Sequence, residues 1–206
     1  MPASHKLYYA PGTCALNPHI VLAELGLPVE LVKVDLRTKK CADGSDFKAV
    51  NPLGYVPALV TPDGLTLTEG PAITQYLADL RPDALLAPAN GSADRYVLQQ
   101  WLNFISTEIH KGFSPLFTAS LPAESHTQAR ATLGLRLDML SERLRGKDFL
   151  LFDRFTIADS YLFTVLRWTV FTGIDVAQWP ELDRYVAQLR TRPSVVQAMA
   201  EEGIKR

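Results

Sequence analysis

The chain has 206 residues, 47% of them hydrophobic and 21% charged, with a formal net charge of −1. This is the composition of a globular protein with a sizeable core in one or two domains, and without a basic run it argues against a nucleic-acid-binding surface. The N-terminal stretch lacks an apolar signal core, and no apolar run approaches a membrane span, so we expect a cytoplasmic protein that does not bind membranes. Two cysteines, Cys14 and Cys41, are too few for a disulfide framework and are expected to be thiols.

The first third of the chain alternates between strand and helix patterns. Residues 6–10 and 29–36 are rich in Val, Leu and Tyr and are predicted strands. Between them, residues 14–27 have helical spacing that stops at a glycine, which gives a β-α-β unit. Residues 56–69 predict a hairpin around the turn sequence TPDG, and residues 70–80 predict a helix. This order fits a small mixed sheet with helices on its faces.

A change of pattern follows at residues 81–92, where two prolines and an Asn-Gly pair predict a linker. Beyond it no segment has a convincing strand pattern. The segments that support helices are 93–110, 126–146, 157–173 and 179–203. We therefore expect an α+β fold, with a mixed-sheet domain at residues 1–84 and an all-helical domain at residues 85–206.

The segment that begins near residue 157 is apolar on nearly all sides, which predicts a helix at the centre of the helical domain. Thr156 lies three residues before Asp159, the spacing of a variant capping box. We interpret this pair as structural: it starts a buried helix and does not touch substrate.

Cys14 is the first candidate for chemistry, because it follows Pro-Gly at a strand–turn–helix junction. Unpaired N–H groups at a helix start carry partial positive charge, so a thiolate there is stabilised. Its pKa can then fall well below the value of about 8.5 for a free thiol. A small buried cysteine that only fills the core is the alternative. Position alone leaves both interpretations open.

Two loops could hold an extended ligand. Pro57 precedes a strand, and a cis bond after Val56 would leave the Val56 backbone N–H and C=O free for a peptide-like ligand; a simple loop proline is the alternative. Glu69 and Gly70 precede a helix whose first turn carries Pro71. N–H groups at that helix start suit a carboxylate, and Glu69 suits an ammonium group. Alternatively, Glu69 is only a favourable charge at a helix start.

A polar stripe marks the otherwise apolar helix around residues 101–113. Asn103, Thr107 and His110 are spaced i, i+4 and i+7, which places them on one helix face. Such a stripe either faces water or lines a cleft, and a lone histidine is more often structural than functional.

Taken together, these segments resemble the glutathione transferases, and specifically the bacterial beta class. The motifs that carry the resemblance are KLYYAPGTCALNPHI, VDLRTKK, NPLGYVPAL, LTEGPAITQYLAD, QQWLNFISTEIHKGFSPLF and FTIADSYLFTVLRW. They occur in the order of the family and cover nearly the whole chain.

The resemblance implies a thioredoxin-like N-terminal domain, an all-helical C-terminal domain, a homodimer, and glutathione as co-substrate. The sequence itself has no metal-ligand cluster, so we expect no metal and no other cofactor. It places Cys14 beside the glutathione sulfur, where it can form a mixed disulfide. The other positions that it assigns are Lys39, Glu69 and Gly70 for the charged ends of the tripeptide, Val56 for the backbone of its cysteinyl part, and Asn103, Thr107 and His110 near the ligand, some of them across the dimer interface.

Three positions depart from the family pattern. Ala15 and Gly70 stand where relatives commonly carry serine, so backbone N–H groups would have to serve at Gly70. Cys41 stands beside Lys39 and Lys40, where no cysteine is expected, and we expect it to be a solvent-exposed bystander.

The sequence therefore predicts a glutathione transferase that directs the thiolate of glutathione at an electrophile or a disulfide, with Cys14 and His110 as the catalytic candidates. One alternative is a thiol–disulfide oxidoreductase or reductive dehalogenase that cycles through a Cys14–glutathione disulfide. Another is a non-catalytic stress protein that binds glutathione or carries ligands.

Overall fold

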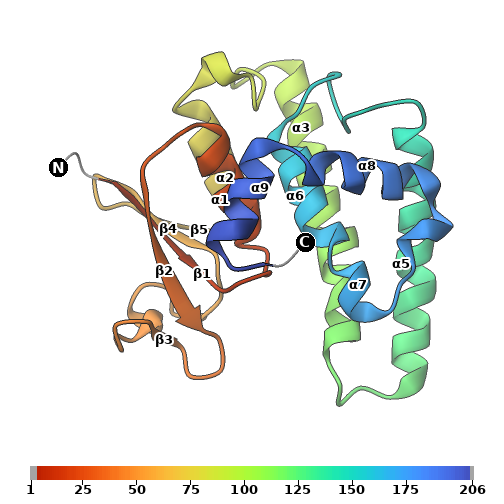
Figure 1. The fold of residues 1–206 in the computed structure, drawn as a ribbon, viewed down its shortest axis with the longest axis horizontal. Helices are drawn as coiled ribbons and strands as arrows, with labels where there is room; N and C mark the ends of the chain where they lie inside the picture. The colour runs from red at the N-terminus through yellow and green to blue at the C-terminus, as the bar shows by residue number, and fades with distance from the viewer. Residues whose placement is uncertain (1–3, 205–206) are drawn as a thin grey trace. The chain divides into compact units, whose positions relative to one another are not determined.

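The computed structural model describes residues 4–204 (Figure 1). Its contacts group the chain into two compact units. The first unit holds the residues up to Ala87 together with those from Arg192 onward, and the second holds Pro88–Thr191. The predicted domain boundaries, 1–84 and 85–206, remain a prediction. The packing differs from them in two respects: the first unit extends to Ala87, and the last helix belongs to it.

The first unit is built on a five-stranded sheet of order β3-β2-β1-β4-β5. Its strands are β1 (His5–Tyr9), β2 (Val29–Asp35), β3 (Lys40–Cys41), β4 (Ala58–Val60) and β5 (Thr66–Thr68). Strands β1 and β2 are parallel and the other pairs are antiparallel, with Ala58 opposite Thr68 in the predicted hairpin. The thioredoxin-like mixed sheet expected from the sequence is confirmed.

Three helices belong to the first unit: α1 (Leu16–Glu24), α2 (Gly70–Asp79) and α9 (Pro193–Glu201). Two short 3₁₀ turns, η1 (Phe47–Ala49) and η2 (Pro82–Ala84), complete it. The apolar residues of α1 are almost all buried, and α9 packs along α1 although the two are far apart in sequence (Figure 1). Apolar burial of this kind is the main force that holds two helices together.

The second unit is helical throughout, as expected. Its elements are α3 (Ala93–Phe104), η3 (Ile105–His110), α4 (Lys111–Phe113), η4 (Ser114–Phe117), α5 (Ala123–Leu144), α6 (Ile157–Leu166), α7 (Thr169–Thr172), η5 (Val176–Gln178) and α8 (Pro180–Arg190). Every residue of α6 is buried, which confirms its predicted central place. The capping box of Thr156 and Asp159 is also confirmed. Within residues 4–204, no helix is long and apolar enough to cross a membrane.

One helix differs from expectation. The pattern around residues 101–113 predicts a continuous α-helix, but α3 ends at Phe104 and continues as the π-helical segment η3. A π-helical turn holds more residues than an α-helical turn, so side chains beyond Phe104 rotate relative to those before it. Asn103 and His110 therefore do not share one face.

Candidate functional site

Cys14 lies in the turn between β1 and α1, and its side chain is partly exposed. Its sulfur donates a hydrogen bond of 3.3 Å to the carbonyl oxygen of Val56. Thr13 shapes the turn, because its hydroxyl donates to the carbonyl of Ala10 at 2.7 Å and accepts from the N–H of Ala15 at 3.3 Å. Within the described residues, no side chain caps the start of α1. The cysteine is thus held at an uncapped helix start and is not a core filler.

The loop that accepts from Cys14 runs from Asn51 to Pro57. The Val56–Pro57 peptide bond is cis. The buried side chain of Asn51 closes the loop, since its amide donates to the carbonyl of Tyr55 at 2.7 Å and its oxygen accepts from the N–H of Leu53 at 3.2 Å. Asn51 was not among the predicted site residues. The signal that could have found it is an Asn-Pro pair at the start of a loop, which favours a side-chain-closed turn.

Lys39 is attached to the same loop. Its ammonium donates to the carbonyl of Gly54 at 2.9 Å and lies 5.7 Å from the centre of the Tyr55 ring. A Cβ atom at Gly54 would lie 3.0 Å from Cδ of Lys39, so a larger residue there would displace the lysine. Lys39, Val56 and Cys14 are therefore linked through one loop.

Glu69 and Gly70 lie at the start of α2, where no side chain among the described residues caps the first turn. The side chain of Glu69 is exposed. A Cβ atom at Gly70 would lie 3.5 Å from the side-chain amide of Asn17, in the first turn of α1. The starts of α1 and α2 are therefore neighbours. Glu69 and Lys39 both have positive φ, at 64° and 58°, a conformation that is uncommon for non-glycine residues.

Asn103, Thr107 and His110 do not lie on one helix face, so the prediction of a single polar stripe in the second unit is wrong. Asn103 and Thr107 are exposed, and the hydroxyl of Thr107 donates to the carbonyl of Asn103 at 3.0 Å. His110 instead turns inward. Its Nδ1 lies 2.7 Å from the hydroxyl of Tyr161, and its ring centre lies 4.8 Å from that of Trp168. The added residue of the π-helical turn in η3 accounts for the difference.

The environment of His110 favours its neutral form. Burial, and to a smaller extent the charge of Lys111, lower the pKa of His110 to about 4. At neutral pH the ring then carries one N–H and one acceptor nitrogen, and Nδ1 exchanges a hydrogen bond with Tyr161. Tyr161 was not predicted, because nothing in the local sequence indicates that residues 51 positions apart meet.

The prediction that Cys41 is exposed is wrong. Only 6% of Cys41 is exposed, and it lies in a core cluster with Val34 and Phe47. Alternate residues of a strand point to opposite faces, so Lys40 is exposed while Cys41 points into the core. The strand β3 has two residues, too few for such alternation to be recognised in the sequence.

Comparison with known proteins places the chain in a family. The model of the glutathione S-transferase N-terminal domain matches residues 3–79, and that of the C-terminal domain matches residues 104–193. The glutathione S-transferase GstA of Escherichia coli O157:H7 is 47% identical over 201 residues, which cover 97% of this chain and 100% of that protein.

Solved structures that resemble this chain belong to the same family. The ternary complex of BphK, a bacterial GST, is 52% identical with a TM-score of 0.94, over 96% of this chain and 99% of BphK. A sphingomonad glutathione S-transferase, solved in complex with glutathione, is 44% identical with a TM-score of 0.94, over 97% of this chain and 100% of that one. A beta-class enzyme of Sphingomonas chungbukensis shows the same identity and TM-score.

A thioredoxin-like sheet unit with a cysteine at the start of its first helix, a helical unit after it, and relatives at this identity over nearly the whole length agree with one another. The chain belongs to the glutathione S-transferase family and is a glutathione transferase of the kind found in the bacterial beta class.

Proposed function

We propose that the first unit binds glutathione with its sulfur beside Cys14. The observation that supports this most is the 3.3 Å hydrogen bond between the Cys14 sulfur and the carbonyl of Val56, because it places a thiol next to a backbone segment that can pair with a peptide. In this proposal Lys39 and the start of α2 at Glu69–Gly70 hold the charged ends of the tripeptide. The complex of the sphingomonad relative with glutathione supports the same ligand.

The main reaction in this proposal is conjugation. The thiol of glutathione gives its proton to solvent water, and N–H groups at the start of α1 stabilise the thiolate. The thiolate attacks an electrophilic carbon, a carbon–sulfur bond forms, and the leaving group departs with the bonding electron pair. Such electrostatic stabilisation needs no strong base next to the sulfur.

The partly exposed sulfur of Cys14 favours thiol–disulfide exchange as a second activity. The Cys14 thiolate attacks one sulfur of a glutathione disulfide, forms a new disulfide with that glutathione, and releases the other sulfur as a thiolate. A further glutathione thiolate then attacks the mixed disulfide, which frees Cys14 and yields oxidised glutathione. Reductive dehalogenation through the same mixed disulfide belongs to this second candidate. Membership of an enzyme family leaves the non-catalytic carrier without support.

The remaining expectations belong to the same proposal. Asn103, Thr107 and His110 contribute to glutathione binding or turnover, as the resemblance implies. The working form is a homodimer in the cytoplasm, and the second substrate is a small electrophile or disulfide. Exposed apolar side chains on α3, namely Tyr96 and Val97, are suited to a contact between subunits.

One variant, Cys14→Ala, tests the proposal. Oxidised glutathione should add one glutathione to the wild-type protein, and peptide mapping should place it on Cys14, because Cys41 is buried. Cys14→Ala should lose the adduct and most reduction of glutathione mixed disulfides. Conjugation of an aryl halide should fall less, since its nucleophile belongs to glutathione. An adduct on Cys41 with Cys14 unmodified would overturn the assignment of Cys14.

A further inference from the structure

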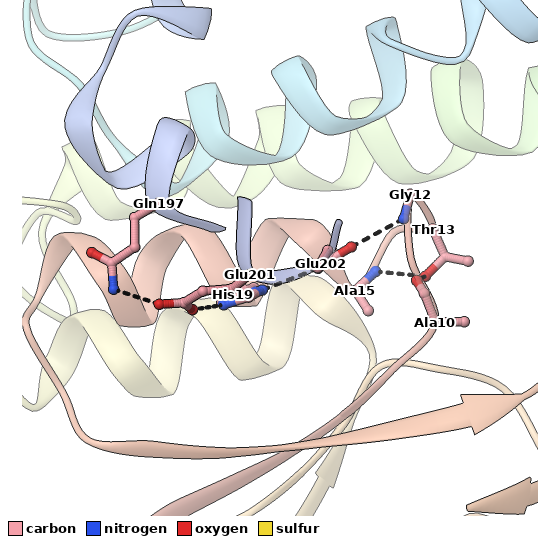
Figure 2. A network of polar contacts seen from close by, with 8 residues as sticks. All are labelled: Ala10, Gly12, Thr13, Ala15, His19, Gln197, Glu201 and Glu202. Atoms are coloured by element: carbon pink, nitrogen blue, oxygen red, sulfur yellow. Dashed lines mark hydrogen bonds and ion pairs between the residues drawn. The ribbon is translucent and has the colours of Figure 1, made fainter. Parts of the chain in front are cut away.

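A row of buried polar contacts joins the end of α9 to the turn that carries Cys14 (Figure 2). One carboxylate oxygen of Glu202 accepts from the backbone N–H of Gly12 at 3.0 Å. The other lies 3.1 Å from Nδ1 of His19. The second ring nitrogen of His19 lies 2.7 Å from Glu201. The row thus ends at a residue two positions before the cysteine.

His19 is the centre of this row, and only 1% of its side chain is exposed. Carboxylate oxygens only accept hydrogen bonds, so both ring nitrogens donate, as in an imidazolium. Burial opposes the charge, but the hydrogen bonds to Glu202 and Glu201 outweigh burial and raise the pKa of His19. Tyr9 also faces the ring, at 6.3 Å between ring centres.

The two glutamates differ in their surroundings. The side chain of Glu202 is fully buried, whereas that of Glu201 is 39% exposed. Glu201 also accepts from the amide of Gln197 at 2.9 Å, and both residues border a cavity of about 570 Å³ beside α1. Solvent therefore reaches Glu201 at the outer end of the row, whereas the contact between Glu202 and Gly12 is partly buried.

Gly12 has a φ of 74°, a conformation that other residues adopt only under strain. A glycine backbone has few preferences of its own, so an external hydrogen bond helps to orient its peptide unit, in addition to the bonds of Thr13 to the carbonyl of Ala10 within the turn. The carboxylate of Glu202 provides such a bond, and the charge makes it stronger than a neutral one. The orientation of this peptide unit sets the path of the chain into Cys14.

A separate ion pair docks the other end of α9 on α1. Arg192 pairs with both carboxylate oxygens of Glu24 at 2.8 and 2.5 Å, and the hydroxyl of Ser194 donates to Glu24 at 2.5 Å. Apolar packing along the two helices adds to this. Contacts other than the one between Glu202 and Gly12 therefore also hold α9 against α1.

We propose that Glu202, held by His19, is a positioning residue for Cys14: its bridge between Gly12 and His19 fixes the turn that aims the sulfur. The inference rests on the proposed role of Cys14. It adds a contribution from residues near the end of the chain to a thiol site near its beginning.

The decisive variant is Glu202→Asp, which keeps the charge but is one methylene too short to reach both Gly12 and His19. We expect oxidised glutathione to label Cys14 more slowly by about fivefold to tenfold, the scale of losing one hydrogen bond. Glu202→Gln keeps the reach and one acceptor oxygen for Gly12, but its neutral hydrogen bond is weaker, so its labelling rate should fall less than that of Glu202→Asp. Labelling is followed by intact mass at one fixed pH.

Glu24→Gln is the matched control, because it weakens the other polar contact between α1 and α9 without touching the turn. A purely structural role for Glu202 predicts equal labelling in Glu24→Gln and Glu202→Asp once both melt cooperatively, and that outcome would overturn the inference. A wild-type protein that is not labelled at Cys14 would instead overturn the proposed function, so the two failures are distinct.

A spectroscopic measurement supports the test even if labelling is slow. In protein labelled with ¹⁵N-glycine, the amide proton of Gly12 should move upfield in Glu202→Asp, because it loses a charged acceptor, and should be unchanged in Glu24→Gln. An unchanged Gly12 resonance in Glu202→Asp would contradict the bridge. The double variant Glu202→Asp, His19→Gln should be labelled within about twofold of Glu202→Asp alone, since both changes act on one contact. Additive losses would remove His19 from the inference.

Discussion

The carboxylate of Asp159 accepts a hydrogen bond of 2.9 Å from the hydroxyl of Tyr185, and both side chains are fully buried. The same carboxylate accepts from the N–H of Leu150 at 2.7 Å and from the N–H and hydroxyl of Thr156 at 2.8 and 2.9 Å. A residue predicted only to cap a helix therefore also ties α6 to α8 and to the loop before it.

Thr156→Ala should lower the free energy of unfolding by about 1 kcal/mol, the usual scale for losing a helix cap. Asp159→Ala should cost more, about 3 kcal/mol, because it leaves several buried donors without an acceptor. Urea unfolding measures both. The affinity of the folded variants for glutathione should barely change, and a loss of affinity without a loss of stability would contradict the structural role.

The low pKa of His110 should make the protein less stable in acid. An unfolded histidine takes up a proton near its ordinary pKa of 6.5, whereas folded His110 stays neutral down to about 4. The unfolded state therefore binds more protons between these values, and stability is lost as pH falls from about 6.5 to about 4, by up to about 3 kcal/mol. His110→Asn should lack this part of the acid loss. Equal pH dependence of the two proteins would contradict the burial of a neutral ring.

The contribution of His19 to the free energy of unfolding should depend on pH in the opposite direction. Its pKa is raised by Glu202 and Glu201 against the effect of burial, so its stabilising contribution is complete below pH 6.5 and is lost as pH rises through the raised value. The difference in unfolding free energy between wild type and His19→Gln should shrink toward alkaline pH. A difference that grows with pH would show that His19 is not an imidazolium in the folded protein.

His110→Ala should lower turnover more than it lowers the affinity for glutathione, by on the order of tenfold, if the ring donates or accepts near developing charge. Tyr161→Phe removes the hydroxyl 2.7 Å from Nδ1 and keeps the ring packing, so it should lower kcat in the same direction but less. Steady-state kinetics with an aryl halide tests both variants. Unchanged kinetics in folded His110→Ala would make His110 a structural residue.

Glutathione should raise the melting temperature, because a ligand that binds only the folded state stabilises it. Glu69→Ala should sharply reduce this rise, since the ammonium group of the ligand would lose its partner. Glu124→Ala is the control, because Glu124 is an exposed acid at the start of another helix, α5. A full glutathione-dependent rise in Glu69→Ala would place the ligand elsewhere.

The sequence predicts what short-range patterns determine. The strand at Val29–Asp35 follows from its Val and Leu content, and the cap of α6 follows from the three-residue spacing of Thr156 and Asp159. The burial of Cys41 and the inward turn of His110 depend on a two-residue strand and on one extra residue in a helical turn. Patterns of period 2 or 3.6 cannot detect either.

The network around His19 was missed for a different reason. Its partner Glu202 is 183 residues away, and two adjacent glutamates near a helix end are an ordinary solvated pattern. Among the candidate site residues, those in local motifs, such as Cys14 and Val56, were found and do meet in the structure. Asn51 closes its loop through local contacts that an Asn-Pro pair could have indicated, whereas Glu202 reaches the turn before Cys14 through a contact that only the fold creates.

The assignment of α9 to the first unit has a consequence for the order of folding. Gly12 and Glu202 are 190 positions apart, so a growing chain must be extended almost to Glu202 before the contact can form. During synthesis the sheet and α1 can assemble first, and the whole second unit is made before α9 arrives to cover α1. The thiol turn should therefore be the last part of the first unit to reach its native geometry, and a nascent chain that stops before Arg192 should carry Cys14 in an unfinished turn.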